Sequence, residues 1–226
     1  EVSTLSATLP SLERCFAIAV ALAGQQPQAH FLCEVGLGGR LDCANVLDAR
    51  LAICAHLSYD HCQVLGHKLW QIAREKLAIA RPDRPLIIAR QSAEGDQAVT
   101  TAMALLFPDQ SGPGPQRLAL REDLLAGLGP LAMAGAHQRD NALSALTALA
   151  ELLPAGQLPA AAAGLARAQL AARSQLVSDG SRRLLIDGAH NAASLAATAA
   201  TAAELLRPGF ALVLGLAQDK DATAAI

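Results

Sequence analysis

The stretch "EVGLGGRLDCANVLD", residues 34–48, places three glycines directly after an apolar run, with an acid before them and "RLD" behind them. A G-x-G-x-x-G dinucleotide loop would need glycine at position 41, where the sequence has Leu41. A G-x-x-x-x-G-K-[ST] phosphate loop occurs nowhere in the sequence. We therefore interpret the glycines as a sharp turn after a strand, in which glycine supplies a positive φ or a close approach of the backbone.

Helical and extended patterns alternate on both sides of this stretch. Apolar residues at helical spacing predict helices, and short apolar runs bounded by turn residues predict strands. The predicted helices are 11–24, 67–80, 137–156, 158–175 (leading into a linker) and the end of 182–206; the predicted strands are 29–35, 50–58, 85–90, 182–186 and the start of 210–221; and 109–116 is a predicted loop. This alternation predicts an α/β fold with a mostly parallel sheet that helices cover on both faces.

The composition favours a globular protein built around small aliphatic side chains. The 226 residues are 52% hydrophobic but only 3% aromatic, and the net charge is −2 without a block of basic residues. Nucleic acid and membrane surfaces are therefore not expected as partners. No apolar run reaches the roughly 18 residues of a membrane span, and the first residues lack a signal-peptide pattern. Five cysteines without a C-x-x-C pair predict a reduced, cytoplasmic protein.

The two ends of the sequence predict that the chain is a fragment. It begins with Glu1 rather than methionine. It stops at "QDKDATAAI", where a helical pattern starts. We therefore expect further residues on both sides.

Three loops are candidates for ligand binding, because ligands lie at the carboxyl ends of the strands in a parallel sheet. They are the glycine loop after Glu34, "YDHCQ" (59–63) and "DGAHN" (187–191). A carboxylate and an imidazole, here Glu34 and His61, suit Mg²⁺ or Mn²⁺ when phosphate oxygens complete the shell. The structural alternative is that Glu34 pairs with Arg40 and that His61 caps the following turn.

Lys76 falls inside the apolar stripe of the predicted helix 67–80, three or four residues from Ile72 and Ile79. A lysine on the inner face must extend its ammonium to solvent, pair with an acid or lose its proton. Carbamylation by CO₂ is a fourth alternative, because it converts the amine into an anion that helps to bind metal. The sequence leaves these alternatives open.

The "DGAHN" stretch places three polar side chains on a predicted strand-to-helix turn. Asn191 or His190 opens the helix, and capping explains the asparagine well. Capping explains Asp187 less well, because this residue precedes the turn, and a hydrogen bond to a ribose or a base is an alternative role.

Five motifs along nearly the whole chain occur in the same order as in one known family. They are "EVGLGGRLDCANVLD", "SYDHCQVLGHKLWQIAREKLAIARPDRP", "HQRDNALSAL", "AARSQLVSDGSRRLLIDGAHN" and "LGLAQDKD". With them the chain closely resembles folylpolyglutamate synthase, in particular the bifunctional dihydrofolate synthase/folylpolyglutamate synthases of the Mur ligase family. The resemblance implies a Mur ligase central, P-loop NTPase-like domain over 1–168, lacking its N-terminal part, and the start of a truncated, Rossmann-like C-terminal domain over 169–226.

The resemblance also implies an activity. ATP phosphorylates the carboxylate of dihydropteroate or a folate, and the amine of L-glutamate displaces the phosphate to form an amide. The cofactors it implies are ATP and Mg²⁺, and the partners are small-molecule substrates of a monomer. The implied roles are metal binding by Glu34 and His61; catalysis by Lys76, as the amine or as the carbamate, and by Asp42; ATP binding by Asn141, Arg173, Asp187 and His190; and substrate binding by Glu13 and Arg40.

Several positions depart from the family pattern. The family's G-x-x-G-K-[ST] phosphate loop is missing, K-A-G-I has become "KLAI", P-G-R has become "AAR", and "DGAHNP" has become "DGAHNA". We therefore expect the 226-residue chain alone not to turn over ATP. The alternative function is a non-catalytic or degenerate homologue that only binds a nucleotide or a partner.

Overall fold

The computed structural model describes residues 11–26, 30–108, 114–206 and 208–216 of the chain. In chain order the elements are α1 (Ser11–Ala23), η2 (Cys43–Val46), β1 (Ala52–Cys54), α2 (Cys62–Leu65), α3 (Leu69–Leu77), β2 (Pro85–Ile88), α4 (Ala93–Leu106), β3 (Gln116–Leu118), η3 (Glu122–Gly127), α5 (Ala136–Leu152), η4 (Ala155–Gln157), α6 (Leu158–Arg167), β4 (Gln175–Asp179), β5 (Arg182–Ile186) and α7 (Ala192–Leu205). The predicted α/β fold class is confirmed.

The central sheet has three parallel strands in the order β1-β2-β3. Ile53 of β1 is in register with Ile87 of β2, which is in register with Leu118 of β3. Helix α3 connects β1 to β2, and α4 connects β2 to β3. Parallel strands need such crossovers. The strands β1 and β2 and the helix α3 were predicted, whereas α4 and β3 were not.

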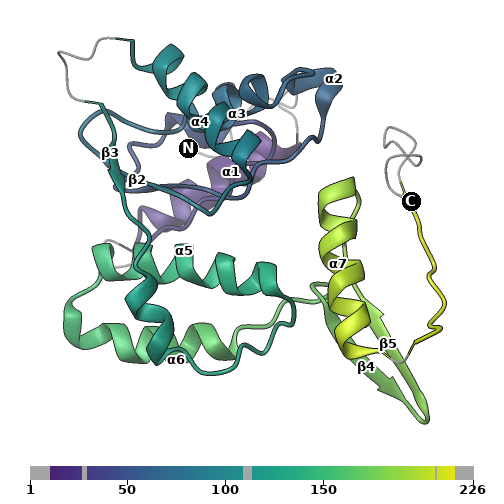
Figure 1. Ribbon diagram of the computed structural model, residues 1–226. Coiled ribbons are helices and arrows are strands. Elements are labelled where there is room, and N and C mark those ends of the chain that lie inside the picture. The colour runs from purple at the N-terminus through teal and green to yellow at the C-terminus, as the bar shows by residue number, and fades with distance from the viewer. Residues whose placement is uncertain (1–10, 27–29, 109–113, 207, 217–226) are drawn as a thin grey trace.

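The main hydrophobic core lies between this sheet and the pair α3 and α4, which pack side by side (Figure 1). Ile72 and Leu77 of α3 and Leu86 of β2 are fully buried in it. On the other side of the sheet, α5 and α6 form a second cluster around Leu146. The predicted covering of both faces of the sheet is therefore observed.

Residues 175–205 form a separate unit of hairpin and helix (Figure 1). Strands β4 and β5 pair antiparallel, from Gln175 opposite Ile186 to Asp179 opposite Arg182. The predicted strand at 182–186 is confirmed, but its partner β4 was not predicted. The predicted helix at 158–175 is too long, since α6 ends at Arg167 and is followed by a linker. We call residues 175–205 the hairpin–helix unit.

Two predicted strands are wrong where the structure describes them. Residues 30–35 and 210–216 contain no strand, and Leu32 and Val213 are 90% and 95% exposed. An apolar run becomes a strand only when a neighbouring backbone pairs with it, and no described residue does so here. Residues 29 and 217–221 of these predictions lie outside the described residues. The predicted loop 109–116 is also described only in part, and its last residue, Gln116, begins β3.

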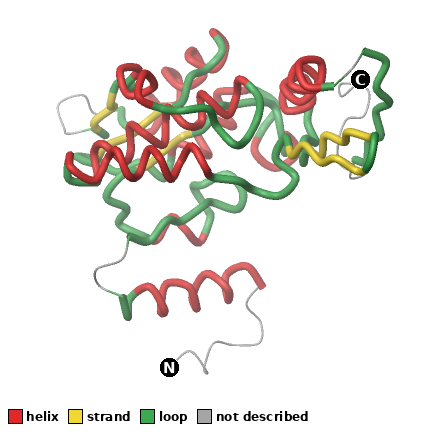
Figure 2. The backbone as a smooth tube through the Cα atoms, turned by 90° about the horizontal axis from the view of Figure 1, so that it is seen from below, coloured by secondary structure: helices red, strands yellow, loops and turns green. Residues whose placement is uncertain are grey.

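Helix α1 is set apart from the packed layers, as Figure 2 shows. None of its residues is buried, although its sequence is mostly apolar. It ends at Ala23, and the N–H of Gly24 bonds to the carbonyl of Val20, as the predicted C-cap requires. Among the residues that the structure describes, no helix has both the length and the apolar character to cross a membrane.

Candidate active site

The glycine loop is a close-approach turn against the last turn of α3. Gly38 and Gly39 are buried and have positive φ angles of 69° and 156°. A Cβ atom on Gly39 would lie 2.8 Å from the carbonyl oxygen of Glu75 and 3.0 Å from that of Lys76. A side chain at this position would therefore push the loop away from α3. The interpretation of the glycines as a turn is confirmed.

Arg40 fastens the same loop to α3. Its backbone N–H donates to the carbonyl oxygen of Glu75 over 2.9 Å, and its Nε donates to Oε1 of Glu75 over 2.8 Å. The alternative pairing of Arg40 with Glu34 is therefore wrong. Glu34 is exposed at the start of the loop and forms no hydrogen bond or ion pair with another described residue.

Asp42 lies beneath the loop and holds its shape. Its Oδ2 accepts the N–H groups of Gly36 and Leu37 over 3.0 and 3.2 Å, and its Oδ1 accepts the N–H of Ala44 over 2.8 Å as the N-cap of η2. Both oxygens are thus engaged with backbone donors. The predicted catalytic role of Asp42 stays a prediction, and its observed contacts position the loop.

Glu13 reaches the same region from α1. Together with burial and the Asp42 carboxylate, its charge raises the pKa of the Cys43 thiol, so the two side chains are neighbours. Oε2 of Glu13 is buried and has no hydrogen-bond partner among the described residues. A buried carboxylate oxygen without a donor favours a ligand that supplies one, which is compatible with the predicted substrate-binding role.

Lys76 lies beside the carboxyl end of β1. Burial raises the pKa of Cys54, the last residue of β1, to about 11, and the positive charge of Lys76 opposes this rise. Lys76 is half-buried and pairs with no acid among the described residues, so this alternative is not observed. Extension to solvent, loss of the proton and carbamylation stay open.

The altered "KLAI" motif fits the fold. Leu77, where the family has alanine, is fully buried in the core between α3 and the sheet. Ala78, where the family has glycine, is the C-cap of α3 with an ordinary φ of −65°. Neither replacement strains the backbone that carries Lys76.

His61 follows β1 and occupies the N-cap position of α2 with a left-handed φ of 49°. Its side chain makes no capping hydrogen bond, so the alternative of a capping imidazole is wrong. The described residues contain no group of three or more His, Cys, Asp and Glu that could hold a metal. Mg²⁺ needs fewer protein ligands, because it keeps several waters and binds phosphate oxygens. No described contact joins Glu34 to His61, and their metal-binding role stays a prediction.

Asp187 ties the hairpin–helix unit together. Its Oδ2 accepts the N–H and the hydroxyl of Ser174 over 2.6 and 3.3 Å. Its Oδ1 accepts the N–H of Ala189 over 2.8 Å and the hydroxyl of Thr198 over 3.0 Å. A carboxylate has about four acceptor sites, so direct contact with a nucleotide would require one of these donors to leave. The predicted ATP contact of Asp187 stays a prediction.

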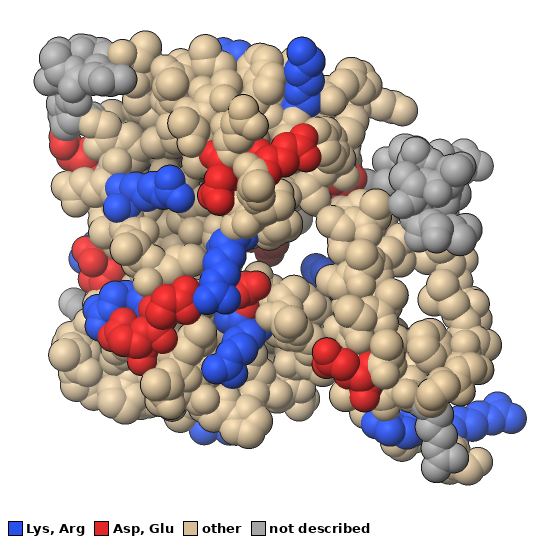
Figure 3. Space-filling model, viewed as in Figure 1, with Lys and Arg blue, Asp and Glu red and all other residues tan. Residues whose placement is uncertain are grey.

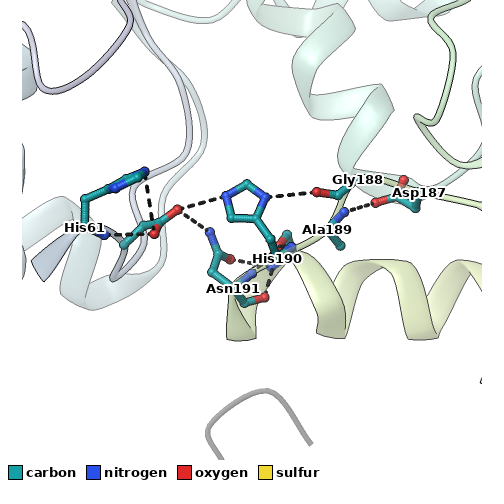
Figure 4. Close-up of polar contacts among 8 residues, drawn as sticks. His61, Asp187, Gly188, Ala189, His190 and Asn191 are labelled. Atoms are coloured by element: carbon teal, nitrogen blue, oxygen red, sulfur yellow. Dashed lines mark hydrogen bonds and ion pairs between the residues drawn. The ribbon is translucent and has the colours of Figure 1, made fainter. Parts of the chain in front are cut away.

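The loop before α7 reaches the loop after β1 (Figure 4). Nε2 of His190 lies 3.1 Å from Oδ2 of Asp60, and Nδ2 of Asn191 donates to the same oxygen over 3.1 Å. Oδ1 of Asn191 also accepts the N–H of Ser194, so the predicted N-cap is confirmed. Asp60, the acid directly before His61, was not among the predicted site residues.

Arg173 and Asn141 occupy different surroundings. Arg173 is exposed beside the 187–191 loop, with one guanidinium nitrogen 3.9 Å from the point where a Cβ on Gly188 would lie. Asn141 is exposed in the first half of α5, where its Nδ2 donates to Oε1 of Gln138 over 3.2 Å. The described contacts thus bring Arg173 to the loop of Asp187, and they do not bring Asn141 there.

Ala172 stands where the family motif has glycine, and its φ of 55° is left-handed. This conformation costs an L-residue roughly 1–2 kcal/mol. We expect Ala172→Gly to raise the free energy of unfolding by about 1 kcal/mol, measured by thermal unfolding and by hydrogen exchange in β4. Ala171→Gly is the control, because Ala171 has no positive φ. An equal gain from both substitutions would contradict this explanation.

A charged network that the sequence analysis missed lies at the end of β2. Arg90 donates to both carboxylate oxygens of Glu122 over 2.6 Å and to Oδ1 of Asp140 over 2.7 Å, and these acids raise its pKa further. Figure 3 shows acidic and basic side chains interspersed on one face of the molecule rather than gathered by sign. The network joins β2 to η3 and α5.

Comparison with known proteins identifies the class of the fold. The structure superposes on that of Mycobacterium tuberculosis folylpolyglutamate synthase complexed with ADP with a TM-score of 0.68 and 27% identity, covering 89% of this chain and 49% of that one. For the Yersinia pestis bifunctional folylpolyglutamate synthase/dihydrofolate synthase complexed with AMPPNP and Mn, the TM-score is 0.65 at 26% identity, over 83% and 46% of the two chains. The fold is that of a Mur ligase.

The sequence comparison narrows this class to one family. The chain is 32% identical over 202 residues to the dihydrofolate synthase/folylpolyglutamate synthase of Escherichia coli K12, which covers 84% of this chain and 46% of that protein. No protein-family model matches the chain. The chain is thus similar over most of its length to dihydrofolate synthase/folylpolyglutamate synthases, and the predicted resemblance is confirmed. It spans about half the length of the curated relatives that it matches.

Proposed function

We propose that this protein is an ATP-dependent amide ligase that adds L-glutamate to dihydropteroate or to a folate. One observation carries the proposal: the loop of His61 and the 187–191 loop meet at the carboxyl end of β1, beside Lys76. That is the edge at which α/β sheets bind ligands. A relative named dihydrofolate synthase/folylpolyglutamate synthase supports the assignment. Similar solved structures that are complexed with ADP or AMPPNP support it as well.

The chemistry proceeds in two balanced steps. An oxygen of the acceptor carboxylate attacks the γ-phosphorus of ATP, and ADP leaves with the electrons of the broken P–O bond. The amine of glutamate then attacks the acyl carbon, phosphate leaves with the electrons of the C–O bond, and the nitrogen gives up a proton. Both steps need positioning and charge stabilisation more than covalent help from the protein.

The residues divide into those that would contact ligands and those that hold the loops. Glu13 and Arg40 are the proposed substrate contacts, and Arg173, His190 and Asn141 the proposed nucleotide contacts. Asp42 is also proposed to take part in catalysis, and Asp187 is proposed to contact the nucleotide, in addition to the backbone contacts that each makes. The proposed partners are the small-molecule substrates. The protein is proposed to act as a cytoplasmic monomer.

A magnesium ion would offset the charge of the ATP phosphates when it is bound. Glu34 and His61 are the residues proposed to hold it. Lys76, if carbamylated, would place an anion beside them, at the carboxyl end of β1. The division into a central domain (1–168) and a C-terminal domain (169–226) is proposed because α6 ends at Arg167 and the hairpin–helix unit follows.

The test is glutamate-dependent release of ADP by the complete gene product, with dihydropteroate or a folate as acceptor. We expect Lys76→Ala to lower this rate by about 100-fold or more, and the matched variant Lys68→Ala, at the other end of α3, to leave it unchanged. Intact mass in bicarbonate should show a labile addition that Lys76→Ala lacks. Binding of ATP without release of ADP would instead identify a non-catalytic homologue.

A further inference from the structure

The loops on the two sides of the candidate site meet through one carboxylate, that of Asp60. Its Oδ1 accepts the N–H of His61 over 2.8 Å. Its Oδ2 lies 3.1 Å both from Nε2 of His190 and from Nδ2 of Asn191. The Asp60 side chain is only 18% exposed. These contacts join segments 130 residues apart in the chain.

Both sides of this contact are held by their own segments. The Tyr59 hydroxyl donates to Glu94 of α4, which anchors the loop after β1. On the other side, Nδ1 of His190 contacts the carbonyl oxygen of Gly188 over 2.9 Å, and Asn191 caps α7. Asp60 therefore meets two side chains whose positions are already set, so little ordering entropy opposes the contact.

A second contact holds the hairpin–helix unit at another point. Thr201 of α7 is 2% exposed, and a Cβ on Gly135, just before α5, would lie 2.6 Å from its hydroxyl oxygen. One such contact alone would leave the unit free to rotate about it. The Asp60 contact, at the opposite end of α7, removes that freedom.

We propose that Asp60 is a positioning residue that holds the 187–191 loop at the carboxyl end of β1 and so sets the orientation of the hairpin–helix unit relative to the sheet. The docking follows from the contacts of this chain alone. Its consequence for the ligase reaction rests on the proposed function, because it fixes His61 relative to the loop of Asp187.

Backbone ¹⁵N relaxation of the 226-residue chain tests the docking directly. In the unsubstituted chain, amides of α7 and of α3 should share one rotational correlation time. In Asp60→Ala, we expect the rotational correlation time of β4, β5 and α7 to fall by about one third or more. The correlation time of α3 and α4 should change little. Unchanged amide shifts in α3 and α4 will show that the variant folds. An unchanged correlation time in α7 would overturn the proposal.

Two further variants isolate the contact. Asp48→Ala is the matched control, because Asp48 forms an exposed ion pair with Arg84 and has no described contact with the 187–191 loop. Asn191→Ser keeps a good N-cap residue but removes the amide that donates to Asp60. The effect of Asn191→Ser on the correlation time of α7 should disappear in the Asp60→Ala background, since Asn191 and Asp60 act through one contact. Equal effects in both backgrounds would contradict the pairing.

Turnover separates positioning from simple stabilisation. In the complete gene product, Asp60→Ala should lower kcat about tenfold, because the lost interaction aligns groups in the transition state. The KM for ATP should rise as well, because the released loop carries His190, a proposed nucleotide contact. A rise in KM at constant kcat would contradict the positioning role. If the unsubstituted protein releases no ADP, the proposed function fails, while the relaxation experiment still decides whether Asp60 docks the unit.

Discussion

Gly39→Ala is expected to lower the free energy of unfolding by about 3 kcal/mol or more. The added Cβ would lie 2.8 Å from the Glu75 carbonyl oxygen, 2.9 Å from Cγ2 of Ile79 and 3.0 Å from the Lys76 carbonyl oxygen. Two of these neighbours are helix backbone, which cannot move aside. The φ of 156° adds strain for any residue with a side chain.

Urea denaturation followed by the fluorescence of Trp70 measures this effect, because Trp70 is the only tryptophan and packs against the α3 core. Gly127→Ala is the control, since a Cβ on Gly127 would have nothing within 4 Å. A loss at Gly39 no larger than at Gly127 would show that the loop does not pack against α3 as described. The same displacement should weaken any ligand binding that involves Glu34.

Asp187→Ala should cost about 3 kcal/mol, because hydrogen bonds to a charged group contribute roughly 1.5–3 kcal/mol and an unsatisfied buried donor adds its own penalty. The substitution removes the acceptor of Ser174, Ala189 and Thr198 together, and Ser174 is only 3% exposed. We expect the loss to fall on the hairpin–helix unit. Amide hydrogen exchange in β4 and β5 should therefore accelerate more than exchange in β2.

Asp187→Asn divides this effect between the two oxygens. The amide oxygen can still accept from Ala189 and Thr198, whereas the NH₂ group cannot accept the N–H of Ser174. The expected cost is about half that of the alanine variant. Asp48→Ala, which removes an exposed ion pair, should change stability by less than about 1 kcal/mol. Equal costs for the Asn and Ala variants would mean that Ser174 carries the whole effect.

Local sequence signals predicted the parts of this fold that depend on neighbouring residues. The helical periodicity around Ile72, the cap at Asn191 and the turn at Gly39 are each visible within a few residues of sequence. The predicted strand at 29–35 failed for the opposite reason. Whether an apolar run such as "FLCEV" becomes a strand depends on a partner backbone that the run itself does not contain.

The candidate site shows the same division. The motifs placed His61 and Asp187 after strands that the structure contains, and that placement required only the order of elements along the chain. The strand predicted at 29–35, which contains Glu34, is absent from the described residues. Arg40 has Glu34 close by in the sequence, but it pairs with Glu75, 35 residues away. Nothing in the sequence near Arg40 distinguishes these two partners.

The sequence by itself thus determined the alternation of helices and strands, the resemblance to dihydrofolate synthase/folylpolyglutamate synthases and the turn made by "EVGLGGRLDCANVLD". Only the tertiary structure decided that this turn packs on Glu75 and Lys76, that Ala172 is left-handed, and that Asp60 reaches His190 and Asn191. The physical reason is range. Propensity and periodicity act over a few residues, whereas these contacts join segments far apart in the chain that meet only after the sheet and the helices have packed.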